Sequence, residues 1–130
     1  MICLVRAFSQ VLDKPLDELI KGLGHDGSEE IWPGFTRGFH IQEFVHLCYK
    51  YGYTLTPFEW ETIQAPRETC EPYHQDFSEK VRPILKTTKG VIIGYSTQTG
   101  VGHAVASFHG KVYNSSWHKY KPDTYWMVSK

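Results

Sequence analysis

The segment from Gly102 to Trp117 constrains the fold of this chain most, because it carries the pattern of a tight β-hairpin. Two short runs meet at His109-Gly110, and glycine at the second position of a two-residue turn accepts a positive φ without steric cost. Side chains alternate along a strand, so His103 and Val105 are expected on one face of the sheet. Asn114 then faces Val105 and lies diagonal to His103, within reach of it. The hairpin therefore predicts that an imidazole and an amide come together.

The first half of the chain shows helical periodicity. Apolar residues recur at helical spacing in three segments and predict helices over residues 2–12, 15–22 and 41–51. Residues 25–38 are rich in glycine and charged residues, and we expect them to form a loop. A short strand is expected over residues 53–57.

The second half of the chain predicts a sheet. The continuous, β-branched run 90–96 indicates a buried strand. The hairpin follows it, and residues 125–128 are expected to form a last strand. Three prolines predict an irregular segment over residues 57–75, and a short helix is expected over residues 76–85. Helices followed by an antiparallel sheet predict the α+β class, with the N-terminal helices packed on the sheet.

Composition narrows the possible partners. The 14 Lys and Arg residues balance the 14 Asp and Glu residues, which argues against a general nucleic-acid or membrane-surface binder. No apolar run is long enough to cross a bilayer, and the N-terminus shows no secretory signal. The three cysteines, Cys3, Cys48 and Cys70, are odd in number and widely spaced, which fits a reducing compartment. A single cytoplasmic domain, residues 1–130, is the expectation.

Cys3 is the candidate nucleophile. It opens the first predicted helix, where the partial positive charge of the helix N-terminus favours the reactive thiolate. His103 would take the thiol proton, and Asn114 would hold the imidazole through its other nitrogen. Backbone N–H groups at the free helix end would stabilise an oxyanion. These residues therefore predict thiol-mediated attack on a carbonyl.

The order Cys, His, Asn resembles that of the papain-like cysteine peptidases. The resemblance is closer to a family of small phage and bacterial proteins with an N-terminal Cys-x-Val-Arg-Ala helix, a Gly-Lys-Pro-like turn, and a C-terminal His-x-Val-Ala, Gly turn and Asp-Thr-Trp. The counterparts in this chain are residues 3–7, 13–15, 103–106, Gly110 and residues 114–117.

This resemblance implies a single papain-like domain with a Cys3–His103–Asn114 triad. It implies a cysteine peptidase, or a related amide or acyl hydrolase or acyltransferase, that acts on a peptide, a protein or another amide-containing substrate. It implies no cofactor and no metal, and it places the protein in the cytoplasm of a bacterial or phage-infected cell. Trp117 would form a wall of the site and shield the bond between His103 and Asn114.

Two features depart from the papain-like pattern. Such enzymes usually carry a Gln several residues before the Cys as an oxyanion donor, whereas only Met1 and Ile2 precede Cys3 in this sequence. Gln98, in the loop before His103, is the candidate replacement. Asn114 stands where the closer family often has Asp, although Asn is the choice of papain itself.

Other interpretations of the same residues stay open. Cys3 can be a small core residue, as free cysteines often are, and His103 and Asn114 can serve the fold. The alternative function is a papain-like domain that has lost activity and acts as a binding or inhibitory module, such as one encoded by a phage. Cys48 is expected in the core. Cys70 and His74 are too few ligands for a metal site.

Overall fold

The structure, a computed structural model, describes residues 3–60, 83–96, 98–112, 114 and 117–130. The α+β class predicted from the sequence is confirmed, because helices precede an antiparallel sheet along the chain. Within the described part of the chain, no helix is long and apolar enough to cross a membrane.

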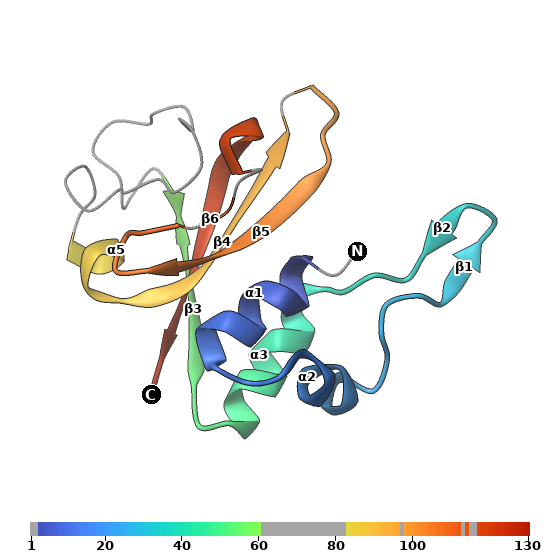
Figure 1. The fold of residues 1–130 in the computed structure, drawn as a ribbon, viewed down its shortest axis with the longest axis horizontal. Coiled ribbons are helices and arrows are strands. Elements are labelled where there is room, and N and C mark those ends of the chain that lie inside the picture. The colour runs from blue at the N-terminus through green and yellow to red at the C-terminus, as the bar shows by residue number, and fades with distance from the viewer. Residues whose placement is uncertain (1–2, 61–82, 97, 113, 115–116) are drawn as a thin grey trace.

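Three helices lie together on one side of the molecule, as Figure 1 shows: α1 (Cys3–Leu12), α2 (Leu16–Leu23) and α3 (Ile41–Lys50). Each agrees closely with a helix predicted from apolar spacing. Helix α2 ends at Gly24, whose φ of 85° is left-handed and whose N–H donates to the carbonyl of Ile20. A residue without a Cβ stops a helix in this way at little steric cost.

The main sheet has four antiparallel strands in the order β3-β6-β4-β5 (Figure 1). They are β3 (Thr54–Glu59), β4 (Lys89–Ser96), β5 (Gly102–Phe108) and β6 (Tyr120–Ser129). Strand β5 is therefore an edge strand, and α1 packs against it and against β4. A short helix α5 (Pro83–Thr87) precedes β4, and a 3₁₀ turn η1 (Trp117–Lys119) precedes β6.

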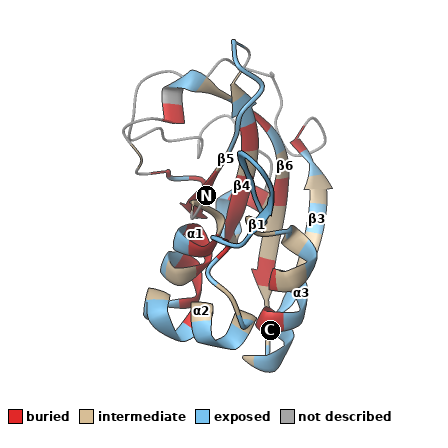
Figure 2. Cartoon of the chain, turned by 90° about the vertical axis from the view of Figure 1, so that its right-hand side faces the viewer, coloured by how far each residue is buried: buried red, intermediate tan, exposed pale blue. Residues whose placement is uncertain are grey.

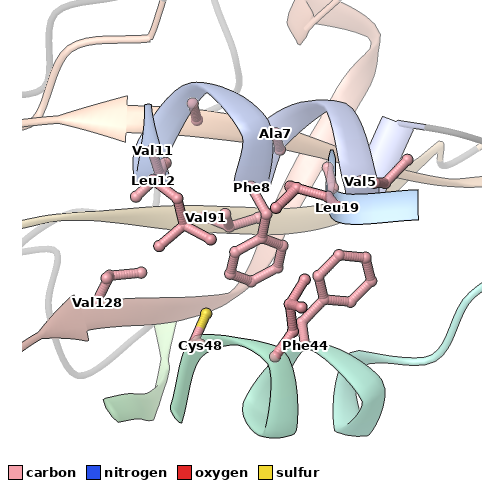
Figure 3. Close-up of a cluster of buried hydrophobic side chains, with 13 residues drawn as sticks. Val5, Ala7, Phe8, Val11, Leu12, Leu19, Phe44, Cys48, Val91 and Val128 are labelled. Atoms are coloured by element: carbon pink, nitrogen blue, oxygen red, sulfur yellow. The ribbon is translucent and has the colours of Figure 1, made fainter. Parts of the chain in front are cut away.

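Buried side chains cover both faces of this sheet, and Figure 2 marks buried residues in red along β4, β5 and β6. On the face toward the helices lies the helix-side cluster. Its members are Val5, Ala7, Phe8, Val11, Leu12, Leu19, Phe44, Leu47, Cys48, Val91, Ala104, Ala106 and Val128. Figure 3 shows Phe8 and Phe44 at its centre, with stacked rings whose centroids lie 4.6 Å apart.

The opposite face carries a second set of buried residues, which we call the outer cluster. Its members are Trp60, Leu85, Ile92, Val105, Val112, Trp117 and Tyr125. Neighbours along a strand divide between the two clusters, as Val91 and Ile92 do, because side chains alternate between the faces. The continuous apolar run of β4 is thus explained by burial on both sides.

The turn of the predicted hairpin is confirmed, and its second strand is not. His109 and Gly110 have φ of 55° and 86°, and Phe108 and Lys111 exchange two backbone hydrogen bonds of 3.0 Å each. Among the described residues, pairing ends with the single bridge between Phe108 and Lys111. Strand β5 pairs along its length with β4 instead.

The last strand is longer than the predicted segment 125–128, since β6 begins at Tyr120. The added part contains Pro122, which has no N–H to donate to a ladder bond. The register between β4 and β6 shifts between Ile93 and Gly94, and Pro122 lies at this irregularity. A proline is tolerated at such a position of an inner strand.

Two other expectations are corrected. Residues 25–38 are not all loop, because β1 (Glu30–Trp32) pairs with β2 (Phe35–Thr36) in a small hairpin that projects from the body (Figure 1). Residues 57–59 belong to β3, where Pro57 is tolerated because β3 is an edge strand. Residues 61–75, and residues 76–82 of the predicted short helix, lie outside the described residues.

Candidate active site

An open cleft of ≈ 570 Å³ lies where the first turn of α1, the segment 36–42 and the beginning of β5 meet. Helix α1 contributes Cys3 and Leu4, and β5 contributes residues 102–104. Two of the three predicted catalytic residues, Cys3 and His103, therefore line the same cleft. The volume lies within the range usual for ligand pockets.

The ring of His103 is held between aromatic side chains. It stacks on Tyr120, with centroids 4.7 Å apart and an interplanar angle of 24°. It also contacts Trp117 at a centroid distance of 6.1 Å. Trp117 is fully buried and stacks on Tyr120 in turn, at 6.0 Å. Trp117 thus contacts His103 but is not among the residues that line the cleft, so its predicted role as a wall of the site stays a prediction.

Asn114 hydrogen-bonds His103, but the paired strand whose side-chain alternation was to bring it there is not seen among the described residues. Burial lowers the pKa of His103 below its usual range, and a side-chain hydrogen bond with Asn114 offsets part of this effect. The Nε2 atom of His103 is buried and has no hydrogen-bond partner among the described residues. A half-buried imidazole of this kind is neutral at physiological pH.

Cys3 and His103 approach the cleft from different faces of the sheet. Cys3 packs against the helix-side cluster, which includes Ala104. Val105 belongs to the outer cluster, and His103 shares its face by alternation and contacts Trp117 there. Both residues line the cleft at the beginning of β5, which is an edge strand. A direct contact between them stays a prediction.

Gln98 lies exposed in the loop between β4 and β5, where its N–H donates to Ser96 Oγ at 3.3 Å. It is not among the residues that line the cleft. The sequence interpretation missed the opposite wall of the cleft, which includes Arg37, His40 and Gln42. The only signal for this wall was the start of the predicted helix at residue 41.

A compact set of contacts holds that wall. Glu43 Oε1 lies 2.6 Å from His25 Nε2, and Glu43 Oε2 accepts a hydrogen bond of 2.8 Å from the N–H of His40. His25 Nδ1 accepts from the N–H of Gly27 at 3.0 Å, so Nε2 carries the proton that is donated to Glu43. The His25 ring stacks on Phe39 at 4.9 Å. The start of α3 and the base of the β1–β2 hairpin are thereby joined.

The other cysteines are separate from the site. Cys48 lies in the core as predicted, and burial raises the pKa of its thiol to about 12. Cys70 and His74 lie outside the described residues. In the described ranges, no group of three or more His, Cys, Asp or Glu side chains could hold a metal ion.

Comparison of the chain with known protein families, with curated proteins and with solved structures finds no match.

Proposed function

We propose that this protein is a papain-like cysteine peptidase or amide hydrolase, with Cys3 as nucleophile, His103 as general base and Asn114 as the residue that orients the imidazole. The observation that supports it most is the hydrogen bond between Asn114 and His103, beside Trp117 and at the edge of the cleft that Cys3 lines. The order of these residues along the chain is also that of the papain-like enzymes.

The reaction follows from the chemistry of these groups. The thiol proton passes to His103 while the sulfur of Cys3 forms a bond to the substrate carbonyl carbon. The carbon–nitrogen bond then breaks, and the leaving amine takes the proton from His103. Water attacks the resulting thioester, His103 moves the water proton to the sulfur, and the acid is released. Because burial lowers the pKa of His103, the unprotonated ring that a base requires is available at neutral pH.

Two groups at the cleft can stabilise the oxyanion in this proposal. The first is the free N–H end of α1, where Cys3 is the first helical residue. The second is the side-chain amide of Gln42, which lines the cleft. Gln42 takes the role for which the sequence suggested Gln98. The substrate class is a peptide, a protein or another amide, in the cytoplasm of a bacterial or phage-infected cell.

A second candidate function is an inactive papain-like module that binds or inhibits a partner. It is favoured by the different faces of the sheet from which Cys3 and His103 reach the cleft. In such a module, Cys3 is a packing residue and the cleft is a binding groove. The two candidates differ in the reactivity of one thiol.

Alkylation of the whole chain with iodoacetamide at neutral pH, mapped by mass spectrometry, tests the proposal. Cys3 should react about tenfold faster or more than the thiol of a short unstructured peptide, since an activated thiol is held partly as thiolate. H103A should remove this advantage, whereas H46A, which changes an exposed histidine on α3 outside the cleft, should keep it.

The same assay distinguishes the enzyme from the inactive binding module. If Cys3 reacts no faster than the peptide thiol, the enzymatic proposal is wrong and the binding module is favoured. If Cys3 is activated, acylation by p-nitrophenyl acetate tests the oxyanion donors. Q42A should then slow release of p-nitrophenolate by about tenfold, and Q98A, which alters the loop outside the cleft, should leave it as in the unaltered chain.

A further inference from the structure

We propose that the cleft selects substrates that carry a negative charge close to the reactive carbonyl, and that Arg37 binds this charge. The inference rests on the proposed function, because it takes Cys3 as the reactive group of the cleft. Among the described lining residues, Arg37 is the only Lys or Arg, and none is an Asp or Glu. The cleft wall opposite Cys3 therefore carries a net positive charge.

The guanidinium of Arg37 keeps donors available for a ligand. Its Nη2 lies 3.7 Å from Glu43 Oε1, which is beyond hydrogen-bond distance. That carboxylate already accepts from His25 at 2.6 Å and from the N–H of His40 at 2.8 Å. The Arg37 side chain is 42% exposed, so its five N–H groups can reach an anion in the cleft.

The backbone around Arg37 is fixed, which makes this cation a built feature of the wall. The N–H of Arg37 donates to the carbonyl of Glu29 at 2.6 Å, and the N–H of Gly38 donates to the carbonyl of Gly27 at 2.9 Å. The next residue, Phe39, is stacked on His25. The backbone of Arg37 is thus positioned by bonds at the base of the β1–β2 hairpin, and Glu43 of α3 lies near its guanidinium.

Among the Lys and Arg side chains near the cleft, Arg37 is the one that supplies positive charge to the described lining. Burial lowers the pKa of His103, which favours the uncharged form of this ring. Glu43 offsets part of the charge of Arg37, but it does not line the cleft, and both of its oxygens are engaged. An anionic substrate group next to the carbonyl would find donors at Arg37, whereas a cationic group would be repelled.

Two alkylating reagents that differ mainly in charge measure this selectivity directly. Iodoacetate is an anion and iodoacetamide is neutral, and both transfer their CH₂ group to the Cys3 sulfur with release of iodide. The ratio of their rate constants at Cys3 cancels differences in thiol reactivity between variants. The ratio of the iodoacetate rate constant to the iodoacetamide rate constant at Cys3 should be about fivefold higher at low salt than for a neutral cysteine peptide.

R37Q should remove most of this increase, and R37K should keep most of it. K21Q removes an exposed charge from α2, outside the cleft, and should leave the ratio unchanged. Circular dichroism of each variant shows that it is folded. An equal ratio in the unaltered chain and in R37Q would overturn the inference, as would an equal drop in K21Q.

These outcomes are distinct from failure of the proposed function. A Cys3 that reacts with iodoacetamide no faster than a peptide thiol contradicts the enzymatic proposal, whatever the ratio. If Cys3 is activated and the ratio equals that of the peptide, the enzymatic proposal stands and the proposed anion site at Arg37 is wrong. An elevated ratio at an unactivated Cys3 supports a binding groove for anions and contradicts a reactive one.

Discussion

Asn114 is the residue for which a role in catalysis can be distinguished most clearly from a role in folding. It hydrogen-bonds the His103 ring and raises the pKa of that ring against the larger, opposite effect of burial. N114A should therefore lower the pKa of His103 further, and N114D should raise it, because a carboxylate stabilises the imidazolium. NMR titration of the imidazole carbon-bound protons measures both shifts.

The stability of the same variants shows whether Asn114 is a positioning residue. One net hydrogen bond is worth about 1 kcal/mol, so N114A should lower the free energy of unfolding by no more than that. Alkylation of Cys3 should slow clearly in N114A and recover in N114D. A variant that melts far earlier while Cys3 reactivity per folded molecule is unchanged would assign Asn114 to the fold.

Sequence reasoning at this scale succeeded where the chemistry is local. The alternation along one strand placed His103 and Val105 on one face, and the structure places both beside Trp117. It could not find Arg37, because that side chain reaches the cleft only through backbone pairing with Glu29. The residues around Arg37 show no sequence pattern that predicts its position near Cys3 and His103, which are far from it along the chain.

Among the elements, the start of α3 depends on a carboxylate that titrates. Burial alone would raise the pKa of Glu43, but the His40 N–H, the His25 bond and the charges of His25 and Arg37 together hold it below its ordinary value of 4.5. A depressed pKa stabilises the fold at pH above the unfolded value, and this contribution is lost as pH falls through the folded value.

E43Q should therefore be less stable than the unaltered chain by about 1 kcal/mol above pH 5. The difference should shrink below the ordinary pKa of Glu43 as the native carboxyl becomes protonated. Urea unfolding across this pH range measures it, with E30Q on the exposed strand β1 as the matched control. A constant difference from neutral to acidic pH would show that the charge of Glu43 is not what stabilises the helix start.

The helices and strands could be predicted from the sequence where only one face of the element is buried. The helices α1, α2 and α3 each bury one apolar face, so the helical spacing of their apolar residues predicts where they begin and end. The β1–β2 hairpin was missed because all of its residues are exposed, including Trp32 at 55%, and no periodicity marks it.

At the scale of the whole molecule, the sheet couples the site to the core through its two faces. Trp117 packs in the outer cluster and also contacts the His103 ring. Gly94 pairs with His103 across β4 and β5 and leaves the space that Trp117 occupies. The sequence showed a continuous apolar strand at β4, but the need for a glycine within it depends on this long-range packing.

A methyl group at Gly94 tests this coupling. The added Cβ would clash with the backbone oxygen of Lys121 and would lie 2.9 Å from Trp117 Cη2, so the backbone of β6 or the indole must move. G94A should lower the free energy of unfolding by about 1–3 kcal/mol, as overpacking usually does. The displaced indole should also change the NMR signals of the His103 ring.

G102A is the matched control, because Gly102 lies in the paired strand β5 and its added Cβ meets only the oxygen of Gly94, at 3.7 Å. Its stability should stay close to that of the unaltered chain in the same denaturant titration. If G94A proves as stable as G102A and leaves the His103 signals in place, Trp117 moves freely within the outer cluster. The imidazole would then be held by Asn114 and Tyr120 alone, and the coupling between core and site would be absent.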